Sequence, residues 1–338
     1  MRNYKNVLGV LLMLLTGLAS ATPALRAQET ASPTTVPVHM VVTVEPLRES
    51  DNTVDSLSRQ DVQVQQGKNR LQVTDWIPER GDQAGLQLFI LIDDTSNTSI
   101  GGPFDDLRAF INAQPATTWI GVGYMRNAAV NIGQNFTTDH AQAAKALRLP
   151  LGGLGASDSP YLSLISLLKG WPENKMRREV LMVTDGIDRI RGYGASAGRG
   201  FGPRAGMQTW AAMSPDVDSA SSAAQQYGVI VHSIYCRGVG HVGRNYYDAS
   251  SGQNGLAKLA DETGGESFFL GVQNPVSFKP YLDRLQMILN NQYFLAFLAN
   301  PGKKAGLQRV KISTEVPKVE IVSADNVWVP ALAPAPKS

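Results

Sequence analysis

The chain has 338 residues, 43% of them hydrophobic, and a formal net charge of +2 that becomes −1 without residues 1–27. This length and hydrophobic content predict a folded protein of about two domains and exclude both a disordered chain and a fibrous protein. A charge so close to zero makes nucleic acid a poor candidate as a partner. Cys236 is the single cysteine, so the chain cannot form an intramolecular disulfide.

The N-terminal residues 1–27 have the pattern of a secretory signal peptide. Two basic residues precede an apolar run over 7–18, and small residues follow, so we expect cleavage after Ala21 or Ala27. The apolar run is too short for a comfortable membrane span. We therefore expect a periplasmic or extracellular protein with no stable membrane span after cleavage, and an uncleaved N-terminal anchor is the alternative.

After the signal peptide, residues 28–37 are rich in Thr, Pro and Ala and predict a flexible start. Residues 38–84 then carry short alternating patterns typical of β-strands, at 39–44, 61–65 and 69–76, and end in a polar linker. Three short strands are too few to form a stable domain by themselves.

Strand and helix patterns alternate over residues 85–291, which predicts βαβ units and a doubly wound, mostly parallel sheet of the α/β class. The predicted strands are 86–92, 119–125, 128–134, 179–184, 229–235 and 267–270, and the predicted helices are 103–112, 139–147, 158–168, 214–227, 255–263 and 276–289.

Strand patterns return over residues 292–329, at 292–298, 307–314 and 319–322. Because strands lie at both ends of a central α/β region, we expect the two flanks to pair into one small β-module. Residues 330–338 are rich in Pro and Ala and predict a disordered tail.

The most informative stretch is residues 86–99, an apolar run followed by carboxylate, hydroxyl and amide side chains. Such a run predicts a strand buried on both faces, and its end places the oxygen ligands at the carboxyl edge of the sheet, where open α/β folds bind ligands. Asp94, Ser96 and Thr98 form an Asp-x-Ser-x-Thr pattern, and Asp185 follows a different predicted strand. These oxygen atoms together predict a site for Mg²⁺, Mn²⁺ or Ca²⁺.

This pattern resembles the von Willebrand factor type A (VWFA) domain, a Rossmann-like fold. Its metal-ion-dependent adhesion site uses Asp-x-Ser-x-Ser, a downstream Thr and an Asp after the fourth strand. The resemblance covers about residues 86–291 and includes the segment 256–265. Residues 59–64 and 292–295 are similar to a secreted subgroup known mainly from Acidobacteria. The resemblance implies a binding module that holds a metal through Asp94, Ser96, Thr98 and Asp185 and recognises a protein ligand through an acidic side chain.

The chain departs from this family at the position of the downstream Thr, where it has Leu154, which has no side-chain oxygen. Ser157, Asp158 and Ser159 in the same loop are possible substitutes. The alternative is a degenerate site whose polar residues cap helices and hydrogen-bond the loop. Asp93 competes with Asp94 for the first position, and the Asp-x-Ser-x-Thr spacing favours Asp94.

Two further motifs were considered as binding sites. Residues 187–206 form a Gly-rich basic insertion containing Arg189, which indicates either a partner-binding loop or a solvated one. Residues 238–243 match Gly-x-Gly-x-x-Gly, but residues 244–254 read as polar loop, not helix, so no phosphate site is expected there. Cys236 follows an apolar strand and is expected to be a buried, inert thiol.

The leading functional hypothesis is therefore a secreted binding or adhesion module and not an enzyme, because no general base or nucleophile accompanies the predicted ligands. The second hypothesis is a structural or assembly protein of the cell envelope that has the same fold without metal. The third is a metal-dependent hydrolase that uses Asp93 and Asp94.

Overall fold

The computed structural model describes residues 35–47, 57–80, 84–153, 157–190, 214–238, 246–269, 271 and 273–332. All of them belong to the unit Pro33–Ser338. The predicted signal peptide, Leu154, residues 191–206 of the basic insertion and residues 207–213 after it lie outside the described residues. Within the described ranges, no helix is both long and apolar enough to cross a membrane.

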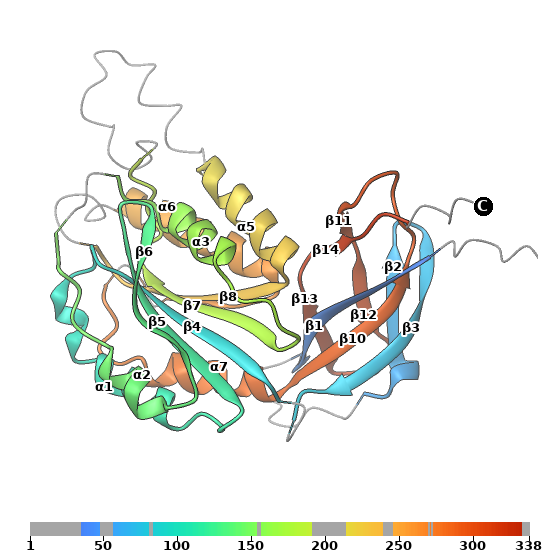
Figure 1. Ribbon diagram of the computed structural model, residues 1–338, viewed down its shortest axis with the longest axis horizontal. Coiled ribbons are helices and arrows are strands. Elements are labelled where there is room, and N and C mark those ends of the chain that lie inside the picture. The colour runs from blue at the N-terminus through green and yellow to red at the C-terminus, as the bar shows by residue number, and fades with distance from the viewer. Residues whose placement is uncertain are drawn as a thin grey trace, which may run out of the picture. The chain divides into compact units, whose positions relative to one another are not determined.

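The central sheet has six strands in the order β6-β5-β4-β7-β8-β9 (Figure 1). Their bounds are β4 Leu86–Asp93, β5 Thr118–Arg126, β6 Ala129–Thr137, β7 Arg177–Thr184, β8 Val229–Tyr235 and β9 Ser267–Phe268. β4 runs parallel to both β5 and β7, whereas β6 at the edge runs antiparallel to β5. The expected α/β fold is present, but the sheet is mixed, because the short turn after β5 leads directly into an antiparallel hairpin.

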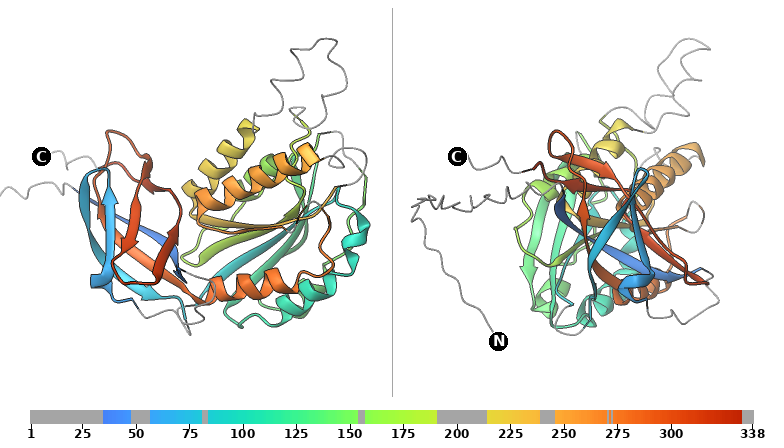
Figure 2. Two further views of the ribbon diagram at one scale, coloured as in Figure 1. Left: turned by 180° about the vertical axis from the view of Figure 1, so that it is seen from behind. Right: turned by 90° about the vertical axis from the view of Figure 1, so that its right-hand side faces the viewer.

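Helices cover both faces of this sheet (Figure 1). One face packs against α1 Phe104–Asn112, α2 His140–Lys145 and α7 Lys279–Asn290, and the other against α3 Pro160–Lys169, α5 Pro215–Tyr227 and α6 Tyr246–Thr263. Figure 2 shows α5 and α6 running side by side over the second face.

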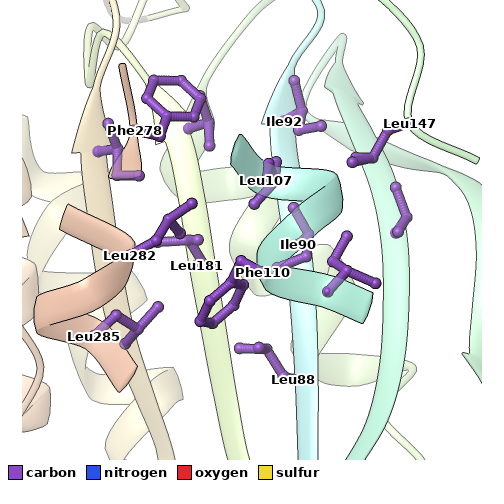
Figure 3. Close-up of a cluster of buried hydrophobic side chains, with 14 of the residues drawn as sticks. Leu88, Ile90, Ile92, Leu107, Phe110, Leu147, Leu181, Phe278, Leu282 and Leu285 are labelled. Carbon is purple, nitrogen blue, oxygen red and sulfur yellow. The ribbon is translucent and has the colours of Figure 1, made fainter. Parts of the chain in front are cut away.

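All eight residues of β4 are buried, as expected for a strand between two helical layers. Successive side chains of a strand point to opposite faces. Leu88, Ile90 and Ile92 therefore pack towards α1 and α7, together with Leu107 and other apolar side chains (Figure 3). Phe89 and Leu91 belong to the core on the other face. The two cores hold the carboxyl end of β4 in place.

The flanking strands form a second sheet, which is antiparallel and has the order β12-β2-β3-β10-β1-β13. Its strands are β1 Val36–Pro46, β2 Val62–Gln66, β3 Asn69–Pro78, β10 Gln292–Ala299, β12 Lys311–Thr314 and β13 Val319–Ser323, with the 3₁₀ helix η1 Arg59–Asp61 before β2. β1 pairs with β10, for example Met40 with Leu295, so strands from both ends of the chain share one sheet. The fold is thus only partly a doubly wound sheet, because this second sheet has as many strands as the central one.

Two C-terminal strands differ from the prediction. The predicted strand 307–314 is divided at Val310 into β11 Gly306–Arg309 and β12, which belong to different sheets. β11 pairs with β14 Asn326–Val329, a strand that the sequence pattern did not indicate separately. At the start of the chain, β1 begins at Val36, inside the segment predicted to be flexible.

The prediction that residues 244–254 form a loop was wrong, because α6 begins at Tyr246. Gly, Ser and Asn are weak helix formers, which concealed the helix in the sequence. Packing provides the stabilisation instead, since Ala249 and Leu256 are buried against Tyr235. The Gly-x-Gly-x-x-Gly motif is therefore followed closely by a helix, although its residues 239–243 lie outside the described ranges.

Candidate carboxyl-edge site

Asp94 and Asp185 follow two neighbouring parallel strands. β4 and β7 pair in register, with Ile92 opposite Val183, so both chains leave the sheet at the same edge. Both aspartates are almost completely buried, at 1% and 0% exposure. A buried carboxylate needs a compensating charge or several hydrogen bonds, so the partners of these two side chains define the chemistry of the edge.

Asp94 is bound by an arginine from a distant part of the chain. Arg148 donates from Nη1 to Oδ1 at 2.6 Å and from Nη2 to Oδ2 at 2.9 Å, which is bidentate geometry. The backbone N–H of Leu151 also donates to Oδ1 at 3.1 Å. The Arg148 guanidinium lies 3.7 Å from the centre of the Tyr124 ring, which fixes its position by a cation–π contact. The hydrogen bond to Asp94 raises the pKa of Arg148.

Asp185 is bound by the arginine four residues later in the chain. Arg189 donates to both carboxylate oxygens, and the backbone N–H of Ile187 donates to Oδ1 at 3.0 Å. The Arg189 side chain is only 9% exposed, and its own backbone N–H donates to the carbonyl of Asp158 at 2.8 Å. A Cβ atom on Gly238 would lie 2.2 Å from Oδ2 of Asp185, so this pair fills the space beneath Gly238.

Asp93 does not share the partners of Asp94. Its Oδ1 accepts from the backbone N–H and the hydroxyl of Thr95 at 2.9 and 2.7 Å, and its Oδ2 accepts from the hydroxyl of Thr184 at 2.7 Å. Burial, and after it the charge of Asp185, raises the pKa of Asp93 to about 6, and Arg189 partly opposes this shift. Asp93 therefore links the ends of β4 and β7 through hydroxyl groups.

The other predicted metal ligands have diverse surroundings. Ser96 is completely buried, its backbone forms an isolated bridge with Gly238, and its hydroxyl has no hydrogen-bond partner among the described residues. Thr98 is exposed and begins the 3₁₀ helix η3 Thr98–Gly101. Asp158 accepts a hydrogen bond from the backbone N–H of Asn127. Ser159 caps α3 by accepting from the N–H of Leu162, and Ser157 is exposed.

The structure places the predicted metal ligands in surroundings that differ in charge and in burial. Both carboxylates already face a guanidinium group, and the Thr98 hydroxyl is exposed while the Ser96 hydroxyl is buried. Among the residues that the structure describes, no three His, Cys, Asp or Glu side chains are grouped so that they could hold a metal ion. Among the described residues of this edge, the buried Ser96 hydroxyl and the buried Nε of Arg189 have no hydrogen-bond partner, which favours an additional ligand.

Arg148 is the residue that the sequence analysis missed. It directly follows the predicted helix 139–147, and the sequence carries no signal that it reaches a carboxylate 54 residues away. Arg189 was noted as part of a basic loop, and its spacing of four residues from Asp185 is the signal that indicates an ion pair.

Comparison with known proteins found similarity at the level of solved structures. No family model and no curated protein matches the chain. An aerotolerance-related membrane protein from Bacteroides fragilis is 11% identical, with a TM-score of 0.40, over 61% of this chain and 99% of that one. The protein BatB from Bacteroides thetaiotaomicron is 12% identical, with a TM-score of 0.40, over 60% and 98% of the two chains.

A von Willebrand factor type A protein from Catenulispora acidiphila is 9% identical, with a TM-score of 0.41, and the match covers 79% of this chain and 76% of that one. The chain is thus similar to VWFA-domain structures at low sequence identity.

Proposed function

We propose that this protein is a VWFA-type interaction module that binds a protein partner through the loops at the carboxyl edge of its central sheet. The single observation that carries the proposal is the set of exposed apolar side chains on these loops. Leu149 is 49%, Leu151 is 63% and Ile190 is 41% exposed. Exposed apolar side chains gathered on loops are typical of surfaces that bind other proteins.

The buried aspartates hold these loops in place. The backbone of Leu151 donates to Asp94, and a Cβ on Gly101 would lie 2.6 Å from Leu149, so this loop packs against η3. Ile190 follows Arg189, which is bound to Asp185. The loops are therefore preorganised, which reduces the entropy lost on binding.

An acidic side chain on the partner is part of this proposal. The Arg148 side chain is 43% exposed and belongs to the same loop as Leu149 and Leu151. Although Asp94 balances its charge, the exposed edge of this guanidinium beside apolar side chains suits a partner surface in which a carboxylate lies next to apolar residues. Nucleic acid is not proposed as a partner, because the net charge without residues 1–27 is −1.

We propose binding and not catalysis for this edge. Asp93 and Asp94 are adjacent in the chain, but one binds hydroxyl groups and the other binds Arg148. The Cys236 thiol is completely buried, and burial raises its pKa, which opposes formation of a nucleophilic thiolate. Both features support a structural role for these side chains in place of a catalytic one.

A structural or assembly role in the cell envelope is the second candidate function. It is favoured by the ion pairs of Asp94 and Asp185, which need no added cation. For both candidates we propose a secreted or periplasmic location, which depends on residues 1–27.

The test is a comparison of two surface variants of the secreted protein. Proteins retained from the envelope fraction of the source cells are identified by mass spectrometry and then purified for binding measurements. We expect to find a partner that binds the wild type and the Leu47→Ser variant. The double variant Leu149→Ser/Leu151→Ser should no longer bind this partner. Leu47 is the matched control, since it is 60% exposed at the end of β1. Equal binding by both variants would contradict the proposal.

A further inference from the structure

The two aspartates at the carboxyl edge are paired with arginines that the fold positions independently of them. The backbone N–H of Arg148 donates to the Tyr124 hydroxyl at 2.6 Å, and its Nη1 donates to the carbonyl of Leu149 at 2.9 Å. Together with the contact of its guanidinium to the Tyr124 ring, these bonds aim the group at Asp94. Arg148 is thus held by at least three contacts in addition to the carboxylate.

Arg189 is fixed in the same way from the other strand. Its backbone is bound to the Asp158 carbonyl, and its Nη1 donates to the carbonyl of Ile187 at 3.4 Å. The carboxylate of Asp185 is completely buried and the side chain of Arg189 almost so. Moving Arg189 away would leave the buried carboxylate of Asp185 without the charge that compensates it, which is strongly unfavourable.

A divalent cation would compete directly with both guanidinium groups. To reach Asp94 it must displace a bidentate pair, and to reach Asp185 it must displace a buried one. If the arginines stayed in place, the added double charge would repel two nearby positive groups at low effective dielectric constant. The charge of each carboxylate is already balanced, so a metal would gain little attraction.

From this geometry we propose that Arg148 and Arg189 serve as built-in cations, so that the carboxyl edge is assembled without a divalent metal. Each arginine neutralises one strand-end carboxylate and ties a loop to it. The inference concerns the cation chemistry of the edge and does not rest on the proposed protein-binding function. A failure to find a protein partner therefore leaves it standing.

The first test is titration of the chain without residues 1–27 with Mn²⁺, Mg²⁺ and Ca²⁺ by calorimetry, with paramagnetic resonance for Mn²⁺. We expect no saturable binding at millimolar metal and no change of Tm on addition of EDTA. Saturable binding with one site per chain that Asp94→Asn abolishes would overturn the proposal. Because the titration is made on the wild type, saturable binding of one metal ion per chain counts against the proposal even if Asp94→Asn does not fold.

The second test is a double-mutant cycle on the unfolding equilibrium with Asp94→Asn, Arg148→Met and the double variant. We expect the unfolding equilibrium constant of the double variant to differ by about tenfold from the value that independent single effects would give. The reason is that each single substitution leaves the other residue of the pair without its charge partner. The matched control is the exposed pair Lys279–Asp283, with side chains 69% and 62% exposed, studied as Lys279→Met and Asp283→Asn. There we expect coupling of about twofold at most. Independent effects of Asp94 and Arg148 would contradict the proposal.

Discussion

Glycine on β5 makes room for an aromatic ring on the neighbouring strand. A Cβ atom on Gly121 would lie 2.5 Å from Cδ2 of Phe89, and one on Gly123 would lie 2.9 Å from its Cζ. Phe89 is 2% exposed, and its ring packs against the buried Trp171 and the partly buried Phe136, which limits its freedom to move.

We therefore predict that Gly121→Ala lowers the free energy of unfolding by about 1–3 kcal/mol through overpacking. The control is Gly102→Ala, where the added Cβ meets no atom within 4 Å and φ is −59°. Its effect is expected to stay within about 0.5 kcal/mol. Urea denaturation measures both, and equal stabilities of the two variants would show that Phe89 can move aside.

Asp188 gives a pH-dependent contribution to stability. It is 2% exposed, its Oδ2 accepts from the Ser214 hydroxyl at 2.6 Å, and burial raises its pKa above the ordinary value of 3.8, helped by the neighbouring Asp216. The folded state therefore binds this proton at a higher pH than the unfolded state does. Its contribution to stability thus increases as the pH falls through the folded pKa towards 3.8.

Asp188→Asn removes this contribution, since Asn does not titrate. The free energy of unfolding of the variant, relative to wild type, should fall as the pH is lowered from about 7 to about 4. Chemical denaturation across this range measures the difference. A difference that is constant with pH would show that the carboxyl group titrates equally in both states.

At the scale of elements, strands were more predictable than helix ends. β4, β7 and β8 are apolar runs with clear limits, and the structure places them within two residues of the predicted bounds. α6 was predicted nine residues too short, because its first half has weak helix formers and is stabilised by distant residues. The division at Val310 was not visible either, since residues 307–314 contain no Gly or Pro to signal a break.

The close contact between α6 and Asp185, the residue that follows β7, provides a prediction for this element. A Cβ on Gly252 would lie 2.0 Å from the carbonyl oxygen of Asp185. Although Ala favours a helix over Gly by about 1 kcal/mol, we expect Gly252→Ala to lower stability by about 1–3 kcal/mol. Ser251→Ala introduces the same residue at an exposed position of α6 and should not destabilise. If Gly252→Ala is the more stable of the two by thermal denaturation, α6 does not pack in this way.

At the scale of the whole molecule, the site was only half predictable. Strand-end carboxylates such as Asp94 and Asp185 could be found because parallel neighbouring strands end at one edge. Arg148 could not be found, because its direction depends on the Tyr124 ring and on the path of the loop after α2. A pattern of ligand types shows which charges meet at an edge but not what compensates them.

Arg177 connects the two sheets at the other end of β7. Its side chain is 5% exposed, and it donates to the side chain of Gln292, the first residue of β10, and to the carbonyl of Leu289 at 3.0 Å. Its Nε also lies 3.6 Å from Oε2 of Glu79, the residue that follows β3. One buried guanidinium thus binds groups that belong to the central sheet's helix α7 and to the antiparallel sheet.

We predict that Arg177→Ala lowers the free energy of unfolding by about 3–5 kcal/mol, because Glu79 and Gln292 lose a buried partner. We also expect it to separate the unfolding of the two sheets, because the shared contact is lost. Trp119 on β5 and Trp76 on β3 lie in the two six-stranded sheets. Each serves as a fluorescence probe in a background in which the other four tryptophans are replaced by Phe. With wild type and with the control Arg309→Ala, whose side chain is 81% exposed, both probes should report one transition. Coincident transitions in Arg177→Ala, at unchanged stability, would show that other contacts couple the sheets.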